Sequence, residues 1–156
     1  MPITKDCKIG DKVSIYHENL VNLYGCSIGA KTQIGPFVEI QKNVVIGSSC
    51  KISSHSFICE GVTIYDNVFI GHGVMFVNDK YPRSVNIDGS IKKDSDWDLK
   101  KTIVEKGVSI GSNATILPGI TIGENALIGA GATITKNISN AKIVVGENRI
   151  IGETII

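Results

Sequence analysis

The sequence lacks several features that would indicate particular classes of protein. Its 156 residues carry a formal net charge of +1, so composition does not favour nucleic acid or a membrane surface as a partner. No apolar run approaches the ~20 residues that a membrane-spanning helix needs. The first residues, from Met1 to Lys5, do not lead into the apolar region of a secretory signal, and we therefore expect a cytoplasmic protein.

Cysteines are few and form no metal-binding or redox motif. Cys7, Cys26, Cys50 and Cys59 include no pair with two residues between its members. Such usage fits a reducing cytosol, and we expect core or surface thiols and no metal site.

Instead, the chain has an aliphatic residue at every sixth position. The first series is Ile28, Ile34, Ile40, Ile46, Ile52, Ile58, Ile64, Ile70 and Phe76, then Val104, Ile110, Ile116, Ile122, Ile128 and Ile134. A second series, four places later in each unit, is Val38, Val44, Cys50, Ser56, Val62, Val68, Val74, then Val108, Ala114, Ile120, Ala126, Ala132 and Ile138. This period fits neither an α-helix nor an alternating strand, and it is typical of a solenoid of parallel β-strands.

The residue types support an all-β solenoid in a single domain. Valine and isoleucine suit short strands, whereas glycine and asparagine tolerate the positive φ of sharp corners. One unit cannot bury its own apolar face, so stability must come from stacking many units.

The repeat divides the domain 1–156 into five segments. Residues 1–27 are irregular first coils, in which Ile9, Ile15 and Val21 stay in step. Regular coils cover 28–76 and 104–138, separated by an extended loop at 77–103. Residues 139–156 are apolar but out of phase, and we expect a cap on the last open sheet edge. Long loops in compact domains are usually functional or disordered, which directs attention to 77–103.

Stacking predicts which distant residues meet. If three units form one coil, as in known hexapeptide proteins, residues eighteen apart lie above one another. One such column contains Lys42, Glu60 and Asn78, and another contains Pro36, Ser54 and His72. Glu60 and Asn78 should therefore be neighbours, about 5 Å apart, where the loop leaves the solenoid.

The repeat resembles that of the left-handed parallel β-helix acyltransferases, which are typically homotrimers with active sites between subunits. The run from Phe76 to Ser84 is similar to the F-x-N-x-x-x-P-R-[SA] segment of N-acetyltransferases that act on nucleotide-linked 3-amino sugars. The segment from Ala114 to Ala132 is similar to the coils on their coenzyme A side. The resemblance implies acetyl-CoA as co-substrate, a nucleotide-linked amino sugar as acceptor, and a role in surface-glycan (lipopolysaccharide) biosynthesis.

The same resemblance implies roles for several residues. Asn78 would lie beside the sugar amine with Glu60 nearby, and the departing coenzyme A sulfur can accept the proton in such enzymes. His55 and His72 are the other candidate catalytic bases. The candidate substrate-binding residues are Arg83, Asp79 and Tyr81. Small residues and one cation are candidates for binding coenzyme A: Ser112, Ala114, Ala130, Gly131, Ala132 and Lys136.

Two stretches depart from the pattern of this family. Val145 to Arg149 replaces the usual V-G-N-P-A-[KR] tail and is one residue shorter, and the loop stretch from Asp88 to Trp97 is long. The resemblance therefore leaves the particular sugar open.

Three other functions compete with this interpretation. The γ-class carbonic anhydrases hold zinc with three histidines, but His17, His55 and His72 lack their spacing. A non-catalytic scaffold could keep the coil, although the long polar loop argues against it. An O-acetyltransferase on the same fold would need a histidine to activate a hydroxyl.

Overall fold

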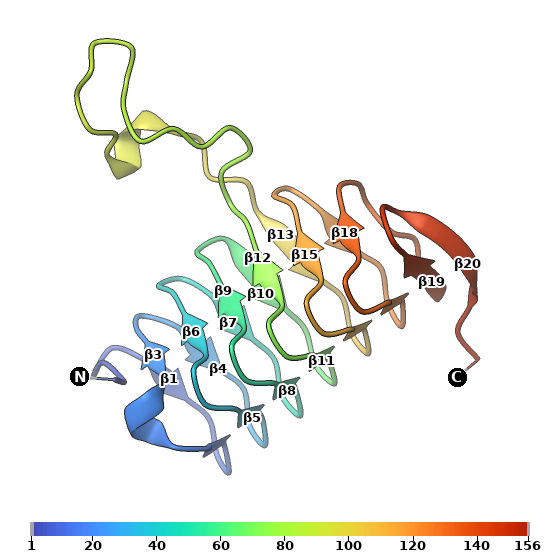
Figure 1. Ribbon diagram of the computed structural model, residues 1–156. Coiled ribbons are helices and arrows are strands. Elements are labelled where there is room, and N and C mark those ends of the chain that lie inside the picture. Colours follow the sequence, from blue (N-terminus) through green and yellow to red (C-terminus); the bar gives the residue numbers. More distant parts are fainter. Residues whose placement is uncertain (1, 156) are drawn as a thin grey trace.

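A computed structural model describes residues 2–155; Met1 and Ile156, at the ends of the first and last expected segments, lie outside the described residues. The chain winds into a three-sided solenoid with one long protruding loop, shown in Figure 1. The expected all-β parallel β-helix is confirmed. The helical segments among residues 2–155 are two short 3-10 turns, η1 (Glu18–Leu20) and η2 (Asp94–Asp96), and no helix there could cross a membrane.

Each side of the solenoid is one sheet, and the chain visits the sheets in the order B, C, A. Sheet B contains β1 (Lys8–Ile9), β4 (Ser27–Ile28), β7 (Val45–Ile46), β10 (Val62–Ile64), β13 (Thr102–Val104) and β16 (Thr121–Ile122). Sheet C contains β2 (Ser14–Ile15), β5 (Gln33–Ile34), β8 (Lys51–Ile52), β11 (Phe69–Ile70), β14 (Ser109–Ile110), β17 (Leu127–Ile128), β19 (Lys142–Val145) and β20 (Arg149–Glu153). Sheet A contains β3 (Asn22–Leu23), β6 (Glu39–Ile40), β9 (Phe57–Ile58), β12 (Met75–Phe76), β15 (Thr115–Ile116) and β18 (Thr133–Ile134).

The hexapeptide register is visible in the strand pairs. Ile34 lies beside Ile52, and Ile52 lies beside Ile70, so each inward residue stacks on its equivalent one coil away. Ile34, Ile52 and Ile70 are all at most 1% exposed. The same stacking brings backbones close together, because a Cβ added at Gly71 would lie 2.6 Å from the amide nitrogen of Ser112. Glycine at that position is therefore a packing requirement.

The first coil departs from the expected phase. Val21 was expected in the first aliphatic series, but Leu23 is the strand residue that pairs with Ile40. The amide of Asn22 bonds the carbonyl of Val38, so Val21 belongs to the second series with Val38. The cause is η1, which adds residues between β2 and β3.

The C-terminal segment closes sheet C. β19 runs parallel to β17, and β20 then pairs antiparallel with β19. An antiparallel last strand breaks the parallel repeat at this end of the sheet.

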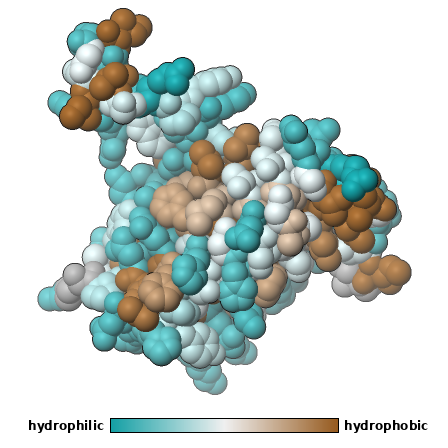
Figure 2. All heavy atoms as spheres, in the orientation of Figure 1, coloured by the Kyte–Doolittle hydropathy of each residue, from teal (hydrophilic) through white to brown (hydrophobic). Residues whose placement is uncertain are grey.

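The long loop leaves the solenoid after β12 and returns to β13, and Figure 1 shows it projecting well beyond the coils. Its root is closed by a hydrogen bond from the Lys100 amide to the Asn78 carbonyl at 3.3 Å. Leu99 packs on Gly61, where an added Cβ would lie 2.6 Å from the leucine Cδ2. The outer part is a small hairpin, with an antiparallel bridge between Val85 and Ile91. Figure 2 shows hydrophobic side chains at its tip, where Ile87 and Ile91 are exposed.

Candidate functional site

The corner between sheets A and B, here called the A–B edge, stacks the three residues that the repeat predicts. The Nδ2 of Asn78 donates a hydrogen bond to the main-chain carbonyl of Glu60 at 3.1 Å. The ammonium of Lys42 lies 3.6 Å from the Glu60 carboxylate. The predicted adjacency of Glu60 and Asn78 is therefore confirmed.

Neighbouring groups orient Glu60. Asn43 donates a hydrogen bond from Nδ2 to Glu60 Oε1 at 2.8 Å. Gln41 Oε1 accepts from the Glu60 amide at 3.1 Å. The Glu60 side chain is 24% exposed, so its carboxylate is held in place but remains accessible to a ligand.

A hollow of about 420 Å³, here called the root hollow, lies where the loop leaves this edge. Its lining combines solenoid and loop residues: Tyr24, Gln41, Lys42, Phe57, Glu60, Asn78, Asp94 and Trp97. Asp94, on η2 of the loop, lies 3.3 Å from Lys42 Nζ and so ties the loop to the solenoid. The hydrogen bond from Lys42 to Asp94 and the charge of Glu60 raise the pKa of Lys42 above its ordinary value. The hollow thus presents two carboxylates, one ammonium and two carboxamides.

Most of its aromatic lining was not predicted as functional. Tyr24 donates to Glu39 at 3.3 Å, and burial together with that carboxylate raises the pKa of the Tyr24 hydroxyl. Stacking at eighteen-residue intervals would have placed Phe57 on the outer face of sheet A. Asp94 and Trp97 carry no such signal, because they lie in the loop and outside the repeat.

The predicted substrate residues of the loop lie further from the edge. Asp79 accepts a hydrogen bond from the Tyr81 amide at 2.9 Å, which forms a turn directly after Asn78. Tyr81 is 74% exposed, with Lys80 Nζ 5.5 Å from its ring centroid. Arg83 is exposed, and no ion pair with Asp79 forms among the described residues.

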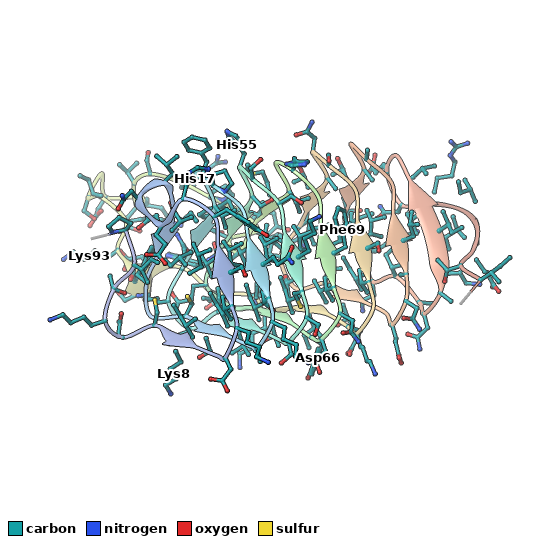
Figure 3. The ribbon with its side chains drawn as sticks, turned by 90° about the horizontal axis from the view of Figure 1, so that it is seen from below. Lys8, His17, His55, Asp66, Phe69 and Lys93 are labelled. Atoms are coloured by element: carbon teal, nitrogen blue, oxygen red, sulfur yellow. The ribbon has the colours of Figure 1, made fainter. Side chains whose placement is uncertain are left out.

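The histidines lie at a different corner, between sheets C and A, here called the C–A edge. Ser54 Oγ and His72 Nδ1 are hydrogen-bonded at 2.8 Å, as the second predicted column implies. His55 packs on Phe37 with ring centroids 4.8 Å apart. Figure 3 shows His17 on the same side of the solenoid as His55, with Asp66 on the opposite side. Strand β12 separates His72 from Asn78, so one chain does not bring these two candidates together.

The residues predicted to bind coenzyme A are divided between surface and core. The Gly131 amide bonds the Ser112 carbonyl at 2.8 Å, and Ala130 is exposed beside them on the C–A edge. Lys136 is exposed on the A–B edge. Ala114 and Ala132 are fully buried, so their methyl groups face the core and only their backbone could reach a ligand.

Nothing in the described range 2–155 groups three His, Cys, Asp or Glu side chains closely enough to hold a metal ion.

Comparison with known proteins agrees with the fold. The family model described as bacterial transferase hexapeptide (six repeats) matches residues 25–60 and 101–136, the regular coils on either side of the loop. The regular coils carry the hexapeptide repeat of this family. A curated relative, the bifunctional protein GlmU of Streptococcus uberis, is 32% identical over 150 residues, which cover 92% of this chain and 31% of the relative. The chain thus spans about a third of the length of the curated relatives it matches.

Solved structures share the same architecture. A mutant of AntD, an N-acyltransferase from Bacillus cereus in complex with dTDP and coenzyme A, is 23% identical with a TM-score of 0.71, covering 94% of this chain and 83% of AntD. A hexapeptide-repeat-containing acetyltransferase from Vibrio cholerae, complexed with acetyl coenzyme A, is 26% identical with a TM-score of 0.68, covering 83% of this chain and 71% of that one.

Proposed function

We propose that this hexapeptide-repeat protein is an acetyl-CoA-dependent N-acetyltransferase that acts on the amino group of a nucleotide-linked amino sugar. The observation that carries the proposal is the pairing of Asn78 with Glu60 in the root hollow, beneath a long loop. The proposed role is in surface-glycan biosynthesis in the cytoplasm.

The polar groups of the root hollow suit an amine. The hydrogen bond to Glu60 uses the Nδ2 of Asn78 and fixes the orientation of the amide. The side-chain oxygen Oδ1 can then accept a hydrogen bond from an N–H of the amine. This bond orients the lone pair of the amine nitrogen toward the thioester. The Glu60 carboxylate, held by Lys42 and Asn43, favours a positively charged group in the same hollow.

The transfer would proceed by direct attack. The amine nitrogen forms a bond to the acetyl carbon, the carbon–sulfur bond breaks, and the departing sulfur or Glu60 takes the proton from nitrogen. No covalent intermediate on the protein is required, and no side chain other than Asn78 and Glu60 needs to approach the amine.

The acetyl donor would lie along the C–A edge and the outer face of sheet A. Ser112, Ala130 and Gly131 are small residues on that edge and permit close approach of a pantetheine arm. We propose a homotrimer, because exposed apolar residues such as Phe69, Met75 and Leu127 remain on the outer faces of the sheets.

The comparisons support the proposal by analogy. AntD is described as an N-acyltransferase and was solved with dTDP and coenzyme A, and the Vibrio cholerae acetyltransferase was solved with acetyl coenzyme A. Both are similar to this chain over most of its length.

The decisive test is an acceptor screen. Purified protein is incubated with acetyl-CoA and a panel of 3-amino and 4-amino nucleotide sugars, free amino sugars, serine and neutral sugars, while thiol release is followed. We expect release with at least one nucleotide-linked amino sugar, and mass spectrometry should locate the acetyl group on nitrogen. Turnover with hydroxyl acceptors alone, or no binding of coenzyme A, would refute the proposal.

One observation favours a second candidate, O-acetylation. The hydrogen bond between Ser54 Oγ and His72 Nδ1 orients the imidazole and leaves Nε2 free, as a base for a hydroxyl requires. Its place on the C–A edge, away from Asn78, makes it the weaker candidate.

A further inference from the structure

A second hollow, here called the loop hollow, adjoins the root hollow across Trp97. It measures about 280 Å³ and is lined by Asp79, Lys80, Tyr81, Lys92, Trp97, Asp98 and Lys100. Trp97 borders both hollows and is partly buried. A ligand could therefore extend from one hollow to the other along this indole.

The two hollows differ in the sign of their charge. The root hollow has two carboxylates, Glu60 and Asp94, against the single ammonium of Lys42. The loop hollow has three ammonium groups against two carboxylates. This reversal over neighbouring hollows suits a ligand with a cationic group at one end and an anionic group further along.

The lysines of the loop hollow are only weakly neutralised. Lys100 lies 4.0 Å from Asp98, whose side chain is 91% exposed, so this contact is loose. Lys80 and Lys92 have no carboxylate within 4.0 Å among residues 2–155. Asp79 accepts a hydrogen bond from the Tyr81 amide and forms no ion pair with a lysine among residues 2–155. Two or three ammonium groups are thus free to meet an anion.

The aromatic residues of the loop hollow add a second kind of recognition. Tyr81 is 74% exposed, and Trp97 presents an indole to the same space. Aromatic faces of this kind bind planar bases by stacking, at about 1–3 kcal/mol per base in nucleic-acid complexes. Lysine is a common phosphate ligand that acts as a point charge.

We propose that the loop hollow binds the nucleoside diphosphate part of the acceptor, with the diphosphate on Lys80, Lys92 and Lys100 and the base against Trp97 or Tyr81. The sugar then reaches past Trp97 into the root hollow, where its amine meets Asn78 and Glu60. This orientation of the acceptor rests on the proposed function, whereas binding of a nucleoside diphosphate can be tested without it.

Trp97 is the single tryptophan of the chain, so its fluorescence reports on the boundary between the two hollows. We would titrate the intact protein with dTDP and with UDP, and in parallel with thymidine, inorganic pyrophosphate, coenzyme A and acetyl-CoA. We expect saturable quenching by a nucleoside diphosphate, weakened by salt and at least tenfold weaker for the nucleoside. Quenching by coenzyme A but by neither nucleoside diphosphate would overturn the assignment.

Substitutions provide the second arm. The double variant Lys80→Ala/Lys92→Ala should weaken nucleoside diphosphate binding at least tenfold, whereas Lys106→Ala, an exposed lysine on another corner, should leave it unchanged. Trp97→Phe, followed by calorimetry, should retain binding because the aromatic face remains, and Trp97→Ala should weaken it. Unchanged binding in the double variant would overturn the proposal.

The two proposals fail differently. Acetyl transfer to amino sugars without any nucleotide, unaffected by the lysine substitutions, would overturn this inference and leave the N-acetyltransferase standing. Tight nucleoside diphosphate binding without acetyl transfer to any amine would confirm the loop hollow and refute the proposed reaction.

Discussion

Asn78 and Glu60, eighteen residues apart in the sequence, lie on adjacent coils and are joined by a hydrogen bond of 3.1 Å from the Asn78 side chain to the Glu60 carbonyl. The same bond supports the start of the loop and orients a carboxamide in the root hollow. Structure and proposed chemistry therefore depend on one contact, and substitutions must separate the two roles.

Asn78→Ala should lower kcat about 100-fold, because the acceptor amine loses the group that orients it. Loss of the hydrogen bond should cost only about 1 kcal/mol of stability. Steady-state kinetics and thermal unfolding measure the two effects. Asn43→Ala is the matched control, because Asn43 is a neighbouring carboxamide that contacts the carboxylate of Glu60 and not its main-chain carbonyl. Its kcat should fall less than that of Asn78→Ala. Full activity in Asn78→Ala would show that the site is misassigned.

The histidines distinguish amine from hydroxyl chemistry. His72→Ala and His55→Ala should each retain activity within a few-fold, because both residues lie on the C–A edge, away from Asn78. Ser54→Ala, which removes the hydroxyl bonded to His72 Nδ1, serves as control for local packing. Complete loss of turnover in either histidine variant, with an unchanged melting temperature, would favour a histidine base and O-acetylation.

The loop should respond to acid before the solenoid does. Asp96 accepts hydrogen bonds from the Lys93 amide at 2.8 Å and from Asn86 Nδ2 at 3.1 Å, which hold its pKa below the ordinary value of 3.8. A lowered pKa in the folded state means that this stabilisation is complete above pH 3.8 and disappears as the pH falls through the lower folded value.

We therefore expect the emission of Trp97, the residue that follows η2, to change below about pH 4 while the β-sheet circular dichroism persists. In Asp96→Asn the loop should already be loosened at neutral pH, and the acid transition should weaken or vanish. If the Trp97 emission and the circular dichroism change together at every pH, the loop does not respond to acid before the solenoid and the prediction is wrong.

Thiol reactivity should distinguish Cys7 from the other cysteines. Burial raises the pKa of Cys26 to about 12 and that of Cys59 to about 11, and it also raises the pKa of Cys50. Cys7 is only partly buried, so mild alkylation near pH 8 should modify about one thiol per chain. Peptide mass spectrometry checks the site, and Cys7→Ser should abolish the fast reaction. Rapid labelling of Cys26 would indicate that the first coil opens.

The tight stacking of coils predicts a strong effect of one methyl group. Gly71→Ala would place a Cβ 2.6 Å from the Ser112 amide nitrogen, a backbone atom that cannot move without shifting the next coil. We expect a loss of about 1–3 kcal/mol in the free energy of unfolding, as for other overpacked interiors. Gly131→Ala is the control for the general effect of alanine on an edge, because a Cβ added there meets nothing within 4 Å. The φ of Gly131 is +68°, so this control includes some backbone strain of its own. Equal denaturation midpoints for Gly71→Ala and Gly131→Ala would refute the packing argument.

The repeat predicted the solenoid because its inward residues must stack whatever the corners contain. Ile34, Ile52 and Ile70 could be placed in the core before any coordinates were known, and the eighteen-residue columns placed Ser54 beside His72. The phase of Val21 was wrong, because the turn η1 inserts residues that have no aliphatic signature.

The loop was predicted to be functional, but its contacts could not be predicted. Asp94 reaches Lys42 across fifty-two positions of the sequence, and no periodic rule relates them. The place of Trp97 between two hollows depends on how residues 77–101 fold back on the A–B edge.

By itself the sequence determined the coil, because stacking buries an aliphatic residue at every sixth position. With three units to a coil, as in known hexapeptide proteins, it also predicted the stacking register and the pairing of Glu60 with Asn78. Only the tertiary structure decided that the histidines and Asn78 occupy different corners, and that the loop surrounds a space with opposite charge on its two sides. The physical reason is that backbone stacking is repeated in every coil, whereas the loop is positioned by a few side-chain contacts that occur once.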